Sequence, residues 1–176
     1  MIFTETKLKG AFIIEPERLE DERGLFARTF CQNEFKAHGL NPRIVQCNVS
    51  FNKKRSTLRG MHFQIAPYEE AKLVGCTRGA IYDVIIDLRP DSSTFKQWIA
   101  VELTANNHNM LYVPEGFAHG FQSLEDGTEV FYQMSEFYHS EYASGIRWND
   151  PTFGIEWPGH PGFISERDQH FPDFSA

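Results

Sequence analysis

The sequence predicts an all-β fold, a jelly-roll barrel with a few short helices at its periphery. Aromatic residues make up 14% of the 176 residues, and such residues favour pleated sheets. Short runs with two-residue periodicity follow one another along the chain, separated by turn signals rather than by helical segments. Many short strands without helices between them are typical of a sandwich or barrel, not of a parallel sheet with crossover helices.

The first predicted elements are a strand over 24–30 and a helix over 32–38. The helix is followed by Gly39 and Pro42, which are common just after helix ends. Asp126-Gly127 predicts a hairpin turn between the last two strands. From residue 141 onward Gly, Pro and Trp are frequent, and this tail is expected to wrap the outside of the barrel. The remaining strands are expected at 44–51, 57–64, 72–76, 80–88, 97–103, 110–113, 118–123 and 129–138.

The strand over 44–51 has a polar face. Its odd-numbered residues are apolar, whereas its even-numbered residues include Gln46, Asn48 and Ser50. Because barrel interiors are usually apolar, this row either faces solvent or lines a ligand cavity, and the strand alone favours solvent.

The composition is that of one globular domain, expected to span residues 1–176. Hydrophobic residues make up 41% and charged residues 23%, which excludes a disordered or fibrous chain. The net charge of −7 argues against a nucleic-acid partner. A few arginines in one pocket would still suffice to bind a small anion.

The N-terminal sequence, the apolar segments and the cysteine spacing all bear on where the protein is located. The N-terminal residues contain no continuous apolar segment, and no stretch approaches 18 apolar residues, so neither a signal peptide nor a membrane span is predicted. The three cysteines are widely spaced without a CxxC motif, which argues against a disulfide scaffold or zinc ribbon. We therefore expect reduced thiols and a cytoplasmic location.

Two histidines lie in strand context, His62 in LRGMHFQ and His119 in PEGFAHGF. A lone strand histidine is more often structural than catalytic, but the neighbours of His62 raise its interest. Arg59 precedes it by three residues, and Gly60 allows another group to approach closely. Strand parity places His62 on the same face as Gly60 and Gln64.

Other candidates have equally ordinary interpretations. Lys72 precedes an apolar strand and by itself suggests a surface lysine. Tyr132 and Tyr138 have the same parity, so both can face one cavity, although core or rim aromatics would look the same. Asp168 lies near the C-terminus, where an exposed acid is the usual expectation.

A metal site is not favoured. PEGFAHGF fits the P-x-G-x-x-H pattern of cupin barrels, but metal-binding cupins also supply an H-x-H pair, and here the sequence is His62-Phe63-Gln64. A zinc or iron site usually needs three protein ligands. The chain also lacks GxGxxG, GxxxxGK[ST], GxSxG and HExxH motifs, which leaves Rossmann, P-loop and α/β-hydrolase chemistry without support.

Several segments together resemble one family, the dTDP-4-dehydrorhamnose 3,5-epimerases, which are cupin-fold enzymes. The resemblance runs over nearly the whole chain. It implies a jelly-roll homodimer without metal or organic cofactor, acting on a nucleotide-diphosphate 4-keto-6-deoxysugar. The segments that carry it are DERGLFARTF, QCNVSFNKKRSTLRGMHFQ, LYVPEGFAHGF, EVFYQMSEFYHSEYASGIRWNDP, IEWP and SERD.

The resemblance also implies catalytic roles. The C4 ketone acidifies the C3 and C5 protons, so epimerisation needs a base, a proton donor on the opposite ring face and a group that stabilises the enolate. His62 matches the family's base, and Asp168 matches the acid that orients it. Tyr132 matches the proton donor, and Lys72 matches the residue near the keto oxygen.

Substrate-binding residues carry over in the same way. Arg23 and Arg59 match arginines that bind the diphosphate. The resemblance further implies that the polar row on 44–51 faces a cavity. The other matching positions are Phe26, Gln46 and Asn48 in the nucleoside and sugar environment, and His119 and Tyr138 as further pocket residues.

One matched position departs from the family pattern. Residue 28 is usually Glu but is Arg28 here, and a guanidinium cannot accept a hydrogen bond from a base or ribose. A CDP- or GDP-linked sugar therefore stays open as an alternative to the dTDP sugar. Epimerisation at only C3 or only C5 also stays open, as do a metal-dependent enzyme using His62 and His119 and a non-catalytic sugar-nucleotide-binding cupin.

Overall fold

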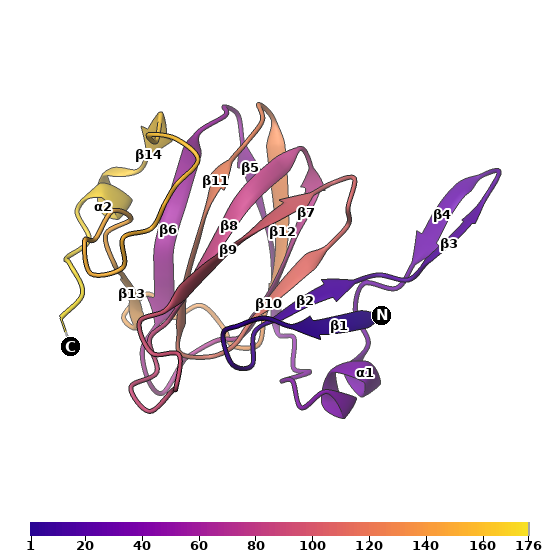
Figure 1. Cartoon of the computed structure of the whole chain (residues 1–176), viewed down its shortest axis with the longest axis horizontal. Coiled ribbons are helices and arrows are strands. Elements are labelled where there is room, and N and C mark those ends of the chain that lie inside the picture. The colour runs from indigo at the N-terminus through magenta and orange to yellow at the C-terminus, as the bar shows by residue number, and fades with distance from the viewer. Residues whose placement is uncertain (176) are drawn as a thin grey trace.

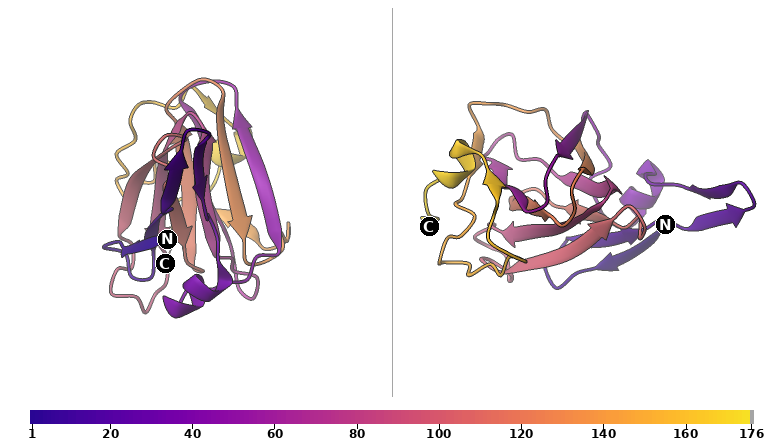
Figure 2. Two further views of the ribbon diagram at one scale, coloured as in Figure 1. Left: turned by 90° about the vertical axis from the view of Figure 1, so that its right-hand side faces the viewer. Right: turned by 90° about the horizontal axis from the view of Figure 1, so that it is seen from above.

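Two antiparallel sheets face each other and form the body of the molecule (Figures 1 and 2). The structure is a computed structural model that describes residues 1–175. The first sheet has the order β1 (Ile2–Glu5), β2 (Phe12–Glu15), β10 (Met110–Val113), β7 (Lys72–Arg78), β12 (Thr128–Met134) and β5 (Gln46–Asn52). The second has the order β13 (Ala143–Gly145), β6 (Thr57–Gln64), β11 (Phe117–Ser123), β8 (Ala80–Asp87) and β9 (Trp98–Thr104). The predicted all-β jelly roll is confirmed.

The main core lies between the two sheets. Most of its members are inward-facing apolar residues of the strands, and two lie in the turn between β1 and β2. Each buried Val, Leu or Ile side chain stabilises the fold by roughly 1.5–3 kcal/mol. The cluster consists of Leu8, Ala11, Val74, Cys76, Ile81, Ile85, Ile99, Leu103, Leu111, Val113, Phe117, Phe121 and Val130.

A second cluster covers part of the outer face of the first sheet. Helix α1 (Gln32–Ala37) packs there through Phe35, which contacts Tyr112 edge to face with ring centroids 5.9 Å apart. The helix was predicted over 32–38 and ends one residue earlier. Leu73 and Met110 are buried beneath it. This half of the first sheet is therefore covered by the main core on its inner face and by α1 on its outer face.

The other half of that outer face is uncovered in the chain. Strand β5 points its polar residues inward and its apolar residues outward, with Val49 59% and Phe51 47% exposed. Phe131 of β12 lies opposite Val49 and is also exposed. We call the exposed set Cys47, Val49, Phe51 and Phe131 the open face.

A two-stranded hairpin projects away from both sheets (Figure 1). It consists of β3 (Arg18–Asp21) and β4 (Gly24–Ala27). The strand predicted over 24–30 therefore ends at Ala27 and joins neither main sheet. The sequence had not predicted β1, β2 or β3. Isolated two-stranded hairpins are marginal in water.

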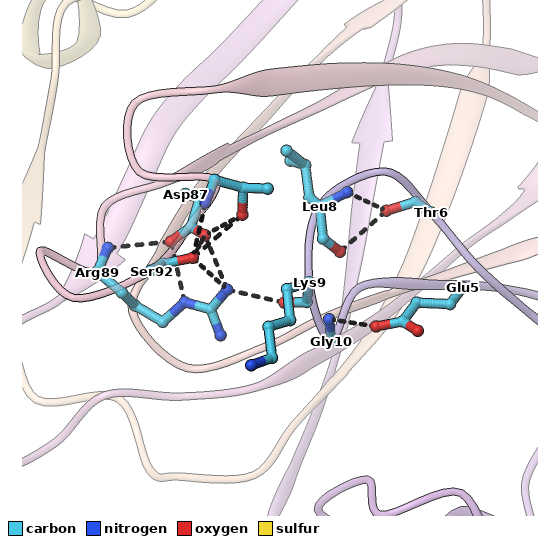
Figure 3. Close-up of polar contacts among 9 residues, drawn as sticks. Glu5, Thr6, Leu8, Lys9, Gly10, Asp87, Arg89 and Ser92 are labelled. Carbon is cyan, nitrogen blue, oxygen red and sulfur yellow. Dashed lines mark hydrogen bonds and ion pairs between the residues drawn. The ribbon is translucent and has the colours of Figure 1, made fainter.

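The loop after β8 is fastened by a buried carboxylate (Figure 3). Asp87 accepts hydrogen bonds from the guanidinium of Arg89 at 2.8 and 2.9 Å and from the hydroxyls of Ser92 and Thr94 at 2.5 and 2.7 Å. Arg89 also donates to the carbonyl of Lys9, which joins this loop to the β1–β2 turn. Burial by itself would raise the pKa of Asp87, but these hydrogen bonds outweigh it and lower the pKa to about 2.

The tail beyond β12 wraps the second sheet, as expected. It contributes β13 at one edge, the two-residue β14 (Phe163–Ile164) parallel to β6, and the short helix α2 (Glu166–Gln169). The strand predicted over 129–138 ends at Met134, so Tyr138 lies in the following loop. None of the helices in residues 1–175 is long and apolar enough to cross a membrane.

Candidate active site

A cavity of about 520 Å³ opens between the two sheets. The first sheet contributes inward-facing residues of β5, β7 and β12, and the second contributes β6 and β11. Of the twelve predicted site residues, eight line this cavity. Asp168 contacts one of them, His62, from behind. The other three lie on or next to the projecting hairpin, away from the cavity.

His62 and Asp168 form a hydrogen-bonded pair at this cavity. Nε2 of His62 lies 2.8 Å from Oδ1 of Asp168, and the other carboxylate oxygen accepts the backbone N–H of Gly60 at 3.0 Å. Asp168 reaches this position from α2, whose N-cap Ser165 accepts the Asp168 N–H. The predicted pairing of these two residues therefore has the geometry of a His–Asp dyad.

The charge state of the dyad follows from its partners. Burial of Asp168 would raise its pKa, but the hydrogen bond and charge of His62 and the Gly60 N–H outweigh burial and lower it. Asp168 is therefore a carboxylate at neutral pH and accepts a hydrogen bond from the Nε2–H of His62. This leaves Nδ1 of His62 as the basic nitrogen.

A bulge in β6 brings Arg59 to the same cavity as His62. Arg59 lies opposite Phe121 and His62 lies opposite His119, so three steps on β6 match two on β11. Simple alternation would place Arg59 on the far face. Gly60 makes the bulge possible: its φ is +136°, and an added Cβ would lie 2.5 Å from the Cα of Gly120.

A second His–Asp pair lies beside the first. His119 is directly across from His62 in the β6–β11 ladder, and its Nε2 lies 2.7 Å from Oδ1 of the fully buried Asp83. Sequence reasoning missed Asp83. Its signal was present, because a lone acid inside the apolar strand AIYDVIID needs a buried partner.

Lys72 is buried in the cavity wall, so its interpretation as a surface lysine is wrong. Its Nζ lies 2.8 Å from Oε1 of Glu70 and 3.4 Å from the carbonyl oxygen of His62. Glu70 was also missed, since sequence alone does not reveal which of Glu69 and Glu70 is buried.

Tyr132 faces the cavity from β12, in the sheet opposite that of His62. Burial raises the pKa of its phenol; the charge of Arg59 opposes this shift and that of Glu70 adds to it. Tyr132 therefore keeps its proton at neutral pH. Tyr138 also lines the cavity, but it does so from a loop, and its backbone N–H donates to Gln46 at 3.1 Å.

The polar row of β5 faces inward, against the preference for solvent drawn from that strand alone. Gln46 donates to Asn48 at 3.2 Å, and both line the cavity. Arg59 is held by Asn52, whose side-chain oxygen accepts from its Nε at 2.8 Å. Arg167 of α2 is a further cation on the cavity wall that sequence reasoning missed.

Three predicted substrate-binding residues lie outside this cavity. Phe26 is on the hairpin and is 70% exposed. Arg23, at the hairpin turn, is paired with Asp21 at 2.6 Å. Arg28 follows β4 and is paired with Glu34 of α1 at 3.0 Å.

The arrangement suits proton transfer across a small molecule. One wall carries a histidine base backed by a carboxylate, and the other carries a protonated phenol and a lysine ammonium, which reaches the carbonyl oxygen of His62. Within residues 1–175, no three His, Cys, Asp or Glu side chains are grouped as a metal site would require. The prediction that no cofactor is needed stays a prediction.

Comparisons with known proteins agree with these features. The family model described as dTDP-4-dehydrorhamnose 3,5-epimerase matches residues 5–176. A relative of that name from Methanothermobacter thermautotrophicus is 46% identical over 96% of this chain and 92% of its own length. The enzyme of that name from Escherichia coli is 42% identical over 93% of this chain and 89% of its own length.

Solved structures give the same result. The dTDP-4-dehydrorhamnose 3,5-epimerase from Bacillus anthracis, with TDP and PPi bound, has a TM-score of 0.95, 41% identity and coverage of 98% and 99% of the two chains. A Legionella pneumophila epimerase in complex with dTDP-4-keto-L-rhamnose has a TM-score of 0.92, 34% identity and coverage of 98% and 92%.

A 3'-monoepimerase from Streptomyces bikiniensis, in complex with dTDP-quinovose, is also similar, with a TM-score of 0.87, 33% identity and coverage of 96% and 85%. The family predicted from the sequence motifs is confirmed by matches that span almost all of the chain. This chain belongs to the dTDP-4-dehydrorhamnose 3,5-epimerase family of isomerases.

Proposed function

We propose that this protein epimerises a dTDP-4-keto-6-deoxyhexose at C3 and C5 and releases dTDP-4-dehydro-L-rhamnose. The observation that carries the proposal is the placement of His62 and Tyr132 on opposite sheets, facing one cavity. Inversion of a carbon needs a proton to leave one ring face and another to arrive on the opposite face. A base and a protonated phenol on opposite walls provide both.

In the proposed mechanism, Nδ1 of His62 removes the proton from C3 or C5, and the C–H electrons pass into the ring as an enolate. Asp168 stabilises the imidazolium that forms. The ammonium of Lys72 stabilises the negative charge on the enolate oxygen. Tyr132 then donates its proton to the same carbon from the other face, the ketone re-forms, and solvent exchange restores both groups.

The diphosphate is proposed to bind near the cavity mouth. Arg59 and Arg167 both line the cavity. Arg59 shares strand β6 with His62, and Arg167 shares helix α2 with Asp168. Guanidinium groups bind phosphate oxygens through charge-assisted, paired hydrogen bonds. Gln46 and Asn48 supply neutral hydrogen-bonding groups for the sugar or the base.

We further propose that the protein works as a homodimer. The open face presents exposed apolar side chains in a contiguous row across β5 and β12, and such a surface is typical of an interface. The projecting hairpin exposes Leu19, Leu25 and Phe26, which a second subunit would cover. Arg23, Phe26 and Arg28 would then contact substrate in the partner's cavity rather than in their own.

A cytoplasmic location is part of the proposal. It is supported by Cys31, Cys47 and Cys76, which are all free thiols in the structure.

The test is proton NMR in D₂O of the purified protein with dTDP-4-keto-6-deoxy-D-glucose. We expect solvent deuterium at both C3 and C5. His62→Asn should abolish the exchange, whereas His160→Asn, which alters an exposed histidine outside the cavity, should leave it unchanged. Exchange at a single carbon would instead indicate a mono-epimerase.

The same experiment with CDP- and GDP-linked substrates tests the nucleotide. Arg28 is paired with Glu34 in the structure, so Glu34 supplies a carboxylate close to the position where the family usually has one. We therefore expect the dTDP sugar to be preferred. If the protein binds these nucleotide sugars but catalyses exchange with none of the three, it is not an epimerase, and the alternative of a non-catalytic sugar-nucleotide-binding protein is correct.

A further inference from the structure

Glu70 is a buried carboxylate in the cavity wall to which no role has been given so far. Its side chain is 4% exposed, and it lies just before β7, two residues from Lys72. One of its oxygens, Oε1, accepts from the Lys72 ammonium at 2.8 Å. Glu70 lines the same cavity as His62 and Tyr132.

The second oxygen of Glu70 is buried without a hydrogen-bond donor among the described residues. A buried carboxylate oxygen that lacks a donor is costly, and native proteins rarely keep one without a reason. The backbone around it gives no relief, because the neighbouring Ala71 N–H is already donated to the hydroxyl of Ser135 at 2.7 Å. This oxygen is closed to the cavity in the chain as it stands, but Glu70 lines the cavity. A small rotation of its side chain on substrate binding would bring the oxygen to a donor there.

The nature of the donor follows from what lies beside it. In the proposed function, Lys72 binds the keto oxygen on C4, and Glu70 contacts the same ammonium. A group next to the ketone therefore lies next to Glu70. Of the two carbons that flank the ketone, C5 carries a methyl group and C3 carries a hydroxyl, which is a hydrogen-bond donor.

We propose that Glu70 is a substrate-binding residue whose free oxygen accepts a hydrogen bond from the hydroxyl on C3, while its other oxygen holds Lys72 at the ketone. The inference rests on the proposed function, since that function places the ketone at Lys72. One carboxylate would thereby recognise an α-hydroxyketone, the substrate class, rather than a ketone alone.

The test compares two ligands and two proteins. The ligands are dTDP-4-keto-6-deoxy-D-glucose and its 3-deoxy analogue, and the readout is kcat/KM for deuterium exchange at C5, which both ligands retain. We expect the unmodified protein to lose about tenfold to a hundredfold on the 3-deoxy ligand, mainly through KM, because a charge-assisted hydrogen bond is lost.

Glu70→Gln should remove this discrimination. Its amide oxygen can stay on Lys72, but the NH₂ group that replaces the free oxygen cannot accept a hydrogen bond. We expect the variant to lose about tenfold on the hydroxylated ligand and to distinguish the two ligands by less than about threefold. Glu69→Gln is the matched control: it removes the same charge one residue away, outside the cavity lining, and should discriminate like the unmodified protein.

Two results would overturn the proposal: equal use of both ligands by the unmodified protein, or undiminished discrimination by Glu70→Gln. If Glu70→Gln does not fold, Glu70→Asp replaces it, because the shorter side chain keeps the charge but withdraws it from one of the two contacts. If the unmodified protein exchanges neither ligand, the proposed function fails. The Glu70 contact is then decided by the ratio of the two Kd values from calorimetry, with the same expected ratios.

Discussion

The cavity and the projecting hairpin are built on opposite principles. Polar side chains of the cavity are held by partners within the chain: Asp168 holds His62, Asp83 holds His119, and Glu70 holds Lys72. The hairpin has less support, from Arg18 of β3, which donates to the carbonyls of Asn106 and Asn107. Its apolar residues are exposed, and it makes no pairing with either main sheet.

The difference separates chemistry from assembly. Groups that transfer protons must be held in place before substrate arrives, because small displacements cost rate. In the proposed dimer, the hairpin needs only a surface complementary to the second subunit. Changes in the cavity should therefore alter catalysis within each chain, whereas changes in the hairpin or the open face should act through the partner.

The largest expected effect comes from Asp168→Asn. The amide carries no negative charge to stabilise the His62 imidazolium, and it can impose the wrong tautomer on the ring. We expect exchange at both carbons to fall by about a thousandfold, measured by NMR in D₂O. Asp173→Asn is the control, since Asp173 is an exposed tail acid paired with Arg147, and it should stay within about twofold of the unmodified rate. A threefold loss or less for Asp168→Asn would remove the dyad from the mechanism.

A charge on the open face should be next in size. Cys47→Glu combined with Phe131→Glu places two carboxylates on the open face at exposed positions outside the cavity lining, so the protein should sediment as a monomer. Exchange should fall on the order of a hundredfold, because each cavity loses an arginine and an aromatic contact together. Phe163→Glu, an exposed position on β14 of the other sheet, should leave both properties unchanged. A fully active monomer would show that the hairpin does not complete the partner's site.

A substitution of Asp87 should change the stability of the fold without changing the cavity. The pKa of Asp87 is about 2 in the folded chain against an ordinary 3.8, so the ionised form stabilises the fold by about 2 kcal/mol. This contribution is complete above the unfolded pKa and is lost as the pH falls through the folded pKa.

The free energy of unfolding of Asp87→Asn, measured in urea, should therefore be lower than that of the unmodified protein at pH 6. The gap should shrink steadily between about pH 4 and pH 2. If the difference in unfolding free energy between the two proteins does not change with pH, the stabilisation comes from the conformation of the loop and not from the charge of Asp87.

The smallest expected effect is that of Phe26→Ala. The side chain is exposed in the chain, so the melting temperature of the subunit should hardly change. We expect KM for the nucleotide sugar to rise about fivefold to tenfold with little change in kcat, since stacking on a base or sugar is lost. Leu25→Ala changes the opposite face of the same hairpin and should have a smaller effect on KM. Equal effects would mean that the hairpin binds the partner but not the substrate.

Most of the fold could be predicted because alternation reports which residues are extended. The strands 57–64 and 110–113 have the predicted bounds. Alternation does not report what a strand pairs with, so the run after Gly24 was predicted but its place in a detached hairpin was not. Alternation also gives the wrong face at a bulge. The extra residue at Gly60 brings Arg59 to the cavity side of β6, whereas alternation from His62 predicts the opposite side.

The candidate site divides in the same way. His62 and His119 could be named from the short motifs around them, whereas Lys72 and Tyr132 received their roles only through the family resemblance. Glu70 could not be named, because burial of an acid depends on which side chains the other strands bring near it. Asp83 could be recognised as a buried acid from its apolar strand, but its partner could not be named for the same reason. The sequence of β5 alone likewise did not decide the direction of its polar row, which faces the cavity while Val49 and Phe51 are exposed.

The origin of Asp168 has a consequence for heat inactivation. This carboxylate sits on a four-residue helix in the tail, which is tied to β6 by a strand of only two residues and by the contacts of Asp168 with Gly60 and His62. Short, exposed attachments open locally at a small fraction of the global free energy. Heating should therefore release β14 and α2 and separate Asp168 from His62 while the long strands of both sheets stay paired. Activity should fall at that point, and on prompt cooling it should return without any refolding of the barrel.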